Sequence, residues 1–277
     1  MQTFYTPSHL LDRPVRVLLV GCGGTGSEVL DGLARMHFAM VALGHPGGLE
    51  ITAVDGDTVS RSNIGRQRFS ASDVGQNKAA VLVHRFNLFY GLSWKAVCGF
   101  LKPDDLDRVQ FDLLITCVDR ASTRVAIGEW ARDRQYLESL WLDFGNGASR
   151  AQVILGHLSK PVRSKVLRLP NVFDLYPELK TVDDNAEPSC SLAEALHAQD
   201  LFVNRFVADA GLAMLWRLFR DGRLEYHGAY LDVSQVSSRP FRIDPETWAF
   251  MGYGKASASV RRKDTTARKH TSKRVAA

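Results

Sequence analysis

Residues 15–26 read VRVLLVGCGGTG, a short apolar, β-branched run that ends in a glycine-rich turn. The run has the length and composition of a buried strand, and the apolar positions of residues 27–43 fit a helix. A glycine turn between a strand and a helix lets backbone N–H groups approach an anion at the helix N-terminus. We therefore predict that the turn binds phosphate through Gly21, Gly23, Gly24 and Gly26, with a purely structural tight turn as the alternative.

The same alternation of strand and helix continues along the chain. Further strands are expected at 49–55, 93–101, 111–119, 140–146 and 150–158, with helices at 73–90 and 120–133. A long helix follows at 191–222, broken near Ala198, and paired strands end the pattern at 223–243. This order predicts an α/β fold with a doubly wound, Rossmann-like, mainly parallel sheet and C-terminal antiparallel strands.

Charge and periodicity divide the chain into a folded part, residues 1–254, and a tail, residues 255–277. The tail holds eight Lys or Arg residues against one Asp, which leaves 27 basic and 29 acidic residues in 1–254. It has no apolar period, so we expect disorder there. Binding of nucleic acid or an acidic partner and plain solvation of the tail both remain open. Within the folded part, residues 157–190 lack a regular pattern, which in a compact domain indicates a functional or mobile segment.

Composition narrows the class of protein. The longest apolar runs are too short to cross a bilayer and the N-terminus does not have the pattern of a signal peptide, so we expect a cytoplasmic protein that does not insert in membranes. Four cysteines, with no C-x-x-C pair among them, argue against a disulfide framework and a structural zinc.

Polar residues after the second strand suggest a nucleotide with several phosphates. Asp55 ends that strand, where a carboxylate accepts hydrogen bonds from ribose hydroxyls, and Asp57 assists it or caps the next turn. Asn63, Arg66 and Lys78 supply donors and positive charge for β- and γ-phosphates, since an arginine makes two parallel bonds to a phosphate. Gln67, beside Arg66, helps to position the same segment.

A carboxylate is also expected near the phosphates. Asp119 ends the fourth strand at the edge of the sheet where ligands lie, and Mg²⁺ prefers hard oxygen ligands that it shares with substrate phosphates. An NAD-dependent oxidoreductase would share the glycine turn but would leave Asn63, Arg66 and Lys78 without a role. A non-catalytic nucleotide-binding scaffold with a basic tail is the other alternative.

These motifs together resemble a known family. The segments GCGGTGS, VDGDTVSRSNIGRQRF, VGQNKA and CVDRASTR are similar to those of the ThiF/MoeB and ubiquitin-activating family of adenylating enzymes. The resemblance covers residues 15–155 well and the helix at 191–220 loosely. More narrowly, the layout resembles ThiF-family proteins of the bacterial PRTRC system.

The resemblance implies a reaction and a set of roles. ATP would adenylate the C-terminal glycine of a small ubiquitin-like or sulfur-carrier protein, releasing pyrophosphate, in an enzyme that works as a homodimer. Gly24 would lie on the phosphates, Asp55 on the ribose, and Asn63, Arg66 and Lys78 on the β- and γ-phosphates. Asp119 would bind Mg²⁺ or lie beside the reacting phosphate, supported by Arg124.

The chain also departs from the family. It lacks the Arg-Tyr-x-Arg-Gln segment that supplies an arginine across the dimer interface; Arg13 is the candidate here. Cys190 opens a helix after the irregular segment, where a stabilised thiolate would form a thioester with the activated acyl group; a plain helix-start cysteine is the alternative. Cys22, Cys98 and Cys117 are expected to be buried structural residues.

Overall fold

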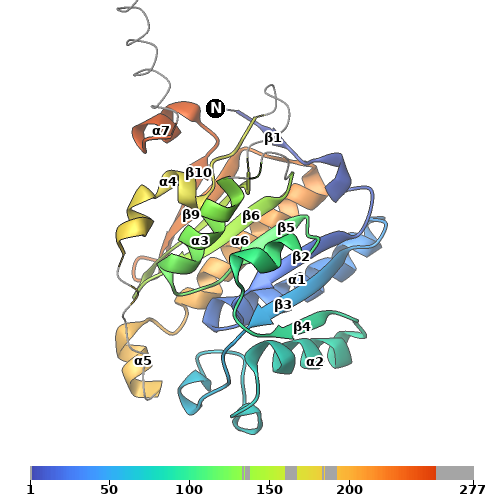
Figure 1. Cartoon of the computed structure of the whole chain (residues 1–277), viewed down its shortest axis with the longest axis vertical. Coiled ribbons are helices and arrows are strands. Elements are labelled where there is room, and N and C mark those ends of the chain that lie inside the picture. Colours follow the sequence, from blue (N-terminus) through green and yellow to red (C-terminus); the bar gives the residue numbers. More distant parts are fainter. Residues whose placement is uncertain are drawn as a thin grey trace, which may run out of the picture.

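An eight-stranded mixed sheet runs through the molecule, with helices on both faces (Figure 1). It is seen in a computed structural model that describes residues 2–132, 134, 138–159, 167–182, 184 and 192–253. The strand order is β10-β9-β7-β6-β5-β2-β3-β4. All further statements concern these residues.

Five neighbouring strands of this sheet are parallel. They are β6 (Leu140–Asn146), β5 (Leu113–Thr116), β2 (Val15–Val20), β3 (Leu49–Asp55) and β4 (Lys95–Cys98), in that spatial order. The chain moves outward from β2 to β3 and β4, then returns to the other side of β2 to form β5 and β6. The strand order therefore reverses between β2 and β5, which is where ligands bind in doubly wound sheets.

The remaining strands extend the sheet in antiparallel fashion. β7 (Arg150–His157) forms a hairpin with β6, β9 (Tyr226–Asp232) pairs with β7, and β10 (Ser237–Arg242) is the edge strand. Pro240 is tolerated in β10 because an edge strand leaves one side without ladder partners. A separate two-stranded ribbon joins β1 (Phe4–Tyr5) to β8 (Arg223–Leu224).

Each face of the sheet has its own apolar core. α1 (Gly24–Ala42), α2 (Lys78–Tyr90) and α6 (Val203–Asp221) cover one face, and α1 packs along α6. α3 (Ala121–Arg132) and α4 (Val172–Leu175) cover the other, where Trp141 is fully buried. Strand residues supply both cores in alternation because successive side chains point to opposite faces.

The expected fold class is confirmed, whereas several boundaries differ from the predicted ones. The helix predicted at 73–90 begins at Lys78, because Ala71–Asp73 forms a separate 3₁₀ turn, η3, and Asn77 caps α2. The strand predicted at 111–119 ends at Thr116, so Asp119 lies in the loop that follows rather than at the strand end. The predicted strand 93–101 is shorter, at Lys95–Cys98.

The chain between β7 and α6 is only partly irregular. Its described residues include α4, the 3₁₀ turn η5 (Pro177–Thr181) and α5 (Leu192–Ala198). The helix break expected near Ala198 is confirmed, since α5 ends there and α6 begins at Val203. Short elements are η1 (Ser8–Leu10), η2 (Arg61–Asn63), η4 (Pro103–Asp107) and α7 (Pro245–Phe250).

Candidate functional site

Three of the predicted site segments lie at the carboxyl ends of the parallel strands. The glycine turn follows β2, Asp55 ends β3, and Asp119 lies in the loop after β5. β2 and β5 are hydrogen-bonded neighbours, so the glycine turn and the loop with Asp119 lie next to each other at the point where the strand order reverses.

The four positions of the turn differ in why they are occupied by glycine. Gly21 has φ +91°, and a Cβ there would lie 2.6 Å from the carbonyl oxygen of Cys117. A Cβ on Gly26 would clash with the carbonyl oxygen of Gly21, and one on Gly24 would meet the side-chain amide of Asn204 at 2.6–2.8 Å. Gly23 has only Gln67 Oε1 nearby, at 3.9 Å, so it is the glycine with the most open space beside it.

The N-terminus of α1 has an anion-binding form. Its N-cap is Gly23, which has no side chain to accept hydrogen bonds from the first turn, and the first turn contains no acidic residue. A 19-residue helix that begins in this way presents backbone N–H groups and the positive end of its dipole to a ligand.

Asp55 fixes the glycine turn to the end of β3. Its two carboxylate oxygens accept hydrogen bonds from the backbone N–H of Cys22 (2.6 Å) and of Asp57 (2.7 Å). Burial raises the pKa of the Asp55 carboxyl, while these two donors and the charge of Lys78 lower it. Each oxygen keeps a further lone pair, so the residue that shapes the turn can also accept a ribose hydroxyl.

Lys78 and Asp57 form an ion pair beside Asp55. Lys78 Nζ lies 3.0 Å from Asp57 Oδ2; the lysine side chain is largely buried, whereas that of Asp57 is 55% exposed. The largely buried Lys78 side chain holds its ammonium close enough for its charge to act on Cys22 of the glycine turn and on Asp55. The ion pair places Asp57 next to Lys78. No rule of sequence spacing predicts a contact across these 21 positions.

The segment 60–69 begins with the 3₁₀ turn η2 (Arg61–Asn63), which has a capping box. Asn63 Oδ1 accepts the backbone N–H of Ser60 at 2.9 Å, and the Asn63 carbonyl accepts the N–H of Gln67. The Asn63 side-chain oxygen therefore holds the turn. The side-chain oxygen of Gln67 is buried and has no hydrogen-bond partner in the part of the chain that the structure describes.

Arg66 is a half-buried cation without an acidic partner among the described residues. Its Nη1 donates to Gln199 Oε1 at 3.1 Å, and its buried Nε has no partner there. Burial lowers the pKa of its guanidinium. By contrast, Arg68, two residues on, is ion-paired with Glu28 at 2.9 Å and Asp31 at 3.2 Å. Arg66 thus has the positive charge that an anionic ligand would neutralise.

The loop after β5 carries Asp119 and is held by Arg124. The Arg124 guanidinium pairs with the buried Asp143 at 2.9 Å and donates to the carbonyls of Val118 (2.8 Å) and Phe144 (2.7 Å). Asp119 is exposed and has no hydrogen bond or ion pair to another described residue. A free carboxylate on a fixed loop has the chemistry of a Mg²⁺ ligand.

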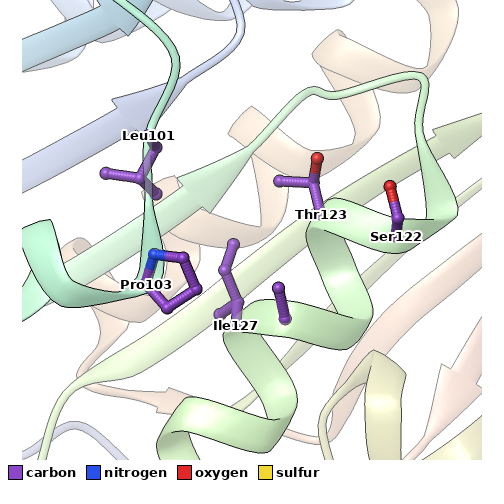
Figure 2. Close-up of a pocket in the computed structure, with 6 residues that line it drawn as sticks. Leu101, Pro103, Ser122, Thr123 and Ile127 are labelled. Atoms are coloured by element: carbon purple, nitrogen blue, oxygen red, sulfur yellow. The ribbon is translucent and has the colours of Figure 1, made fainter.

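A small apolar cavity of about 230 Å³ opens between α3 and the segment after β4. Figure 2 shows Leu101 and Pro103 facing Ile127, with Ser122 and Thr123 at the start of the helix. No motif in the sequence indicates this cavity, because its two walls are separated by about twenty positions. The Asp184 carboxylate accepts the N–H of Ala121 (2.7 Å) and of Ser122 (2.8 Å) at the start of α3.

The cysteine predictions are only partly supported. Cys98 was expected to be buried and is exposed, because β4 is the edge strand of the sheet. Burial raises the pKa of Cys22 and Cys117 well above the ordinary value for a thiol, so neither is an activated nucleophile. Cys190 lies outside the described residues.

Arg13 lies away from this site within its own chain. Its guanidinium makes two hydrogen bonds to Asp112, at 2.8 and 2.9 Å, and Asp112 directly precedes β5. Arg13 itself precedes β2, so the pair lies at the amino ends of the strands, opposite the glycine turn. Because Asp112 already engages the Arg13 guanidinium, fewer of its donors are free to bind a ligand in the site of a partner subunit.

The sequence was also compared with models of protein families, and one of them matches. The model of the ThiF family matches residues 11–198, more than half of the chain, including the glycine turn, Arg66 and Asp119. The chain belongs to the ThiF family. This match supports the ThiF/MoeB resemblance drawn from the motifs; the PRTRC subtype stays a prediction.

Two curated relatives share sequence with this ThiF-family chain. It is 25% identical over 170 residues to tRNA threonylcarbamoyladenosine dehydratase of Haemophilus influenzae, covering 59% of this chain and 61% of the relative. It is 33% identical over 124 residues to adenylyltransferase and sulfurtransferase UBA4 of Yarrowia lipolytica, covering 43% of this chain and 28% of the relative. The chain thus spans less than two thirds of either protein.

Solved structures show the same fold. The PaaA crystal structure matches with a TM-score of 0.55 at 16% identity, and E. coli MccB with ATP matches with a TM-score of 0.54 at 18% identity. Both cover 83% of this chain and 64% of the other chain. Identities this low establish the ThiF-type fold alone.

Two kinds of feature are absent from the described residues. None of their helices is long and apolar enough to cross a membrane. None of their His, Cys, Asp and Glu side chains gather in groups of three or more that could hold a metal ion. A nucleotide-bound Mg²⁺ needs no such group, because it takes one or two carboxylates and completes its shell with phosphate oxygens and water.

Proposed function

We propose that this ThiF-family chain is an ATP-dependent adenylating enzyme, with residues 1–254 as its adenylation domain. Its substrate is the C-terminal glycine carboxylate of a small ubiquitin-like or sulfur-carrier protein, on which it acts as a homodimer in the cytoplasm. The observation that carries the proposal is Arg66, a half-buried guanidinium without an acidic partner among the described residues, close to an uncapped helix N-terminus. Such a site favours a ligand with several negative charges.

The elements of the site match the parts of ATP. The N-terminus of α1 and Gly23 would hold phosphates, Asp55 the ribose, and the cavity between Leu101 and Ile127 the adenine base. The cavity suits a flat, largely apolar ring with a few polar edges, since Ser122 and Thr123 add hydroxyls to apolar walls. Asp119 would hold Mg²⁺, which neutralises part of the phosphate charge when bound.

The reaction requires two anions to meet. One oxygen of the substrate carboxylate attacks the α-phosphorus, the bond from that phosphorus to the bridging oxygen of pyrophosphate breaks, and an acyl-adenylate forms. Arg66 and Lys78 oppose the charge that develops on the leaving pyrophosphate, while Gln67 and Asn63 keep the arginine-bearing turn in place. No general base is needed, because a carboxylate is ionised at neutral pH.

A second step is proposed on Cys190. Its thiolate would attack the acyl carbon of the adenylate, AMP would leave, and a thioester would link the partner to the enzyme. A covalent adduct that thiol reagents cleave, and that Cys190→Ala abolishes, would support this step. Adenylation that proceeds in both proteins without any such adduct would exclude it.

Nucleotide affinity tests the assignment of Arg66. We expect Arg66→Ala to weaken ATP binding about 10- to 100-fold, as loss of a charge-assisted contact does, and to leave AMP binding nearly unchanged. Isothermal titration calorimetry with both nucleotides measures this. Arg220→Ala, which removes an exposed arginine paired with Asp221, is the matched control. Equal affinities of Arg66→Ala and the unmodified protein for ATP would refute the site.

The curated relatives suggest a second candidate substrate. One of them is named for a modified adenosine of tRNA, and the tail of this chain carries seven net positive charges in residues 255–277. A carboxylate carried by an RNA would use the same nucleotide site. ATP–pyrophosphate exchange that requires RNA, and that fails when 255–277 is deleted, would favour this candidate over a protein substrate. Tight NAD binding without ATP binding would instead favour an oxidoreductase.

A further inference from the structure

Arg66 is held by a neutral amide rather than by a carboxylate. The contact joins Arg66 Nη1 to Gln199 Oε1 at 3.1 Å, across 133 positions of sequence. From this geometry we infer that Gln199 is a positioning residue, which aims the Arg66 guanidinium at the nucleotide phosphates and leaves its charge free. The inference rests on the proposed function and adds a residue that the motifs of the site do not contain.

The orientation of the Gln199 amide is determined by its neighbours. Its Oε1 also accepts from Asn204 Nδ2 at 3.1 Å, and its Nε2 donates to the carbonyl of Gly147 at 3.3 Å. A flipped amide would set donor against donor at both Arg66 and Asn204. The oxygen therefore faces Arg66, as an acceptor, in the hydrogen-bonding arrangement that satisfies every partner.

Gln199 belongs to a network that also reaches the glycine turn. Asn204 Oδ1 accepts from Thr25 Oγ1 at 3.0 Å and from Asn146 Nδ2 at 2.6 Å, and Asn204 is 4% exposed. Thr25 lies in the first turn of α1, and the Asn204 side chain occupies the space beside Gly24. Arg66 and the N-terminus of α1 are thus held by one set of amides, which fixes both proposed phosphate contacts together.

The neutral character of the acceptor matters. A carboxylate at position 199 would form an ion pair with Arg66 and compete with phosphate for it, as Glu28 and Asp31 occupy Arg68. The amide oxygen of Gln199 accepts hydrogen bonds from Arg66 and Asn204 and carries no net charge. The other guanidinium donors of Arg66, including the buried Nε, have no partner among the described residues. The site can therefore be rigid before the nucleotide binds and still carry its full positive charge.

The test is a double-mutant cycle on nucleotide binding by the full chain, with ATP and AMP as probes. We expect Gln199→Ala to weaken ATP about five- to tenfold and AMP by less than twofold, because the loss acts through Arg66 on the outer phosphates. In the Arg66→Ala background the same substitution should have a much smaller effect, limited to what Gln199 contributes to the N-terminus of α1 through Asn204. Gln110→Ala is the matched control: it removes an equivalent amide contact to Arg16, 2.6 Å long, at the opposite edge of the sheet.

A charged variant separates positioning from simple packing. We expect Gln199→Glu to weaken ATP more than Gln199→Ala does, and the extra loss to disappear when Arg66 is alanine; plain repulsion by the new carboxylate would persist there. Circular dichroism confirms that each variant is folded. Losses that add in the double variants, or an unchanged ATP affinity in Gln199→Ala, would overturn the inference while Arg66→Ala still supports the ATP site. If Arg66→Ala itself changes nothing, the proposed function fails first.

Discussion

At the scale of single residues, the structure gives a different reason for glycine at position 24 from the one that the motif implies. The resemblance assigns it to the phosphates, yet a Cβ there would meet Asn204 atoms at 2.6–2.8 Å. We expect Gly24→Ala to destabilise the fold by about 1–3 kcal/mol, as overpacking does, and to weaken ATP binding by displacing the amide. Urea unfolding measures the first effect.

The matched background for this prediction is Asn204→Ala, which removes the atoms that a Cβ would meet. There Gly24→Ala should cost much less than in the native background, because the space beside the turn is open. An equal cost in both backgrounds would show that the glycine is needed for backbone conformation or for ligand approach.

Residue types at the site were predictable from the sequence, but their partners were not. Asp55, Asn63, Arg66, Lys78 and Asp119 follow strand ends or fixed turns, so local pattern places them at one edge of the sheet. Gln199 and Asn204 lie more than 130 positions from Arg66, Gln199 in the link between α5 and α6 and Asn204 in the first turn of α6. No local rule pairs an amide in one element with an arginine in another.

At the scale of elements, the loop after β5 depends on one buried ion pair. Arg124 joins Asp143 of β6 to the carbonyl of Val118, and both charged side chains are almost fully buried. We expect Asp143→Asn to lower the free energy of unfolding by about 3–5 kcal/mol, because Arg124 is then left buried without its counter-charge. Asp232→Asn, which alters the surface pair between Asp232 and the exposed Arg150, should cost much less.

Hydrogen exchange distinguishes a local role of this pair from a general one. If Arg124 positions the Asp119 loop, Asp143→Asn should speed amide exchange at 117–120 more than in β2 at the centre of the sheet. Uniform loss of protection would show that the pair stabilises the whole molecule and has no special effect on the site.

One element boundary was predictable from capping motifs, which hydrophobic periodicity does not take into account. Two 3₁₀ turns lie between β3 and α2, and each begins with a serine followed three positions later by Asn63 or Asp73. These are capping boxes, readable in the letters SRSN and SASD. The helix was predicted to begin at 73 because apolar periodicity alone ignores caps. The end of β5 had no comparable signal, since CVD after Thr116 fits a strand as well as a loop.

At the scale of the whole molecule, two buried histidines predict how stability changes with acid. His157 and His227 both have a pKa lowered to about 4, mainly because burial disfavours the charged form. His227 donates from Nδ1 to the Leu155 carbonyl and accepts from Trp248 through Nε2, so the neutral ring satisfies both contacts and a second proton would break one.

The sign follows from proton binding. Between about pH 4 and pH 6.5 the unfolded chain binds protons at these histidines and the folded chain does not, so stability falls as the pH drops through this range. From pH 7 to pH 5 we expect a loss of about 2 kcal/mol per histidine. Carboxylates with lowered pKa, such as Asp112, act only below this range, and Asp55, whose pKa is raised, opposes the trend close to pH 4.

Urea unfolding at several pH values between 5 and 7 tests this. Replacing a buried histidine by glutamine removes one titrating site, so His227→Gln should reduce the slope of stability against pH by about one proton even if the variant is less stable at every pH. His84→Gln, at an exposed position of α2, is the comparison variant for the His→Gln change itself. If the stability of the unmodified protein does not change with pH in this range, the two histidines are protonated in the folded state as readily as in the unfolded state. Protonation of His227 would then have to break its hydrogen bond with Trp248 without unfolding the protein.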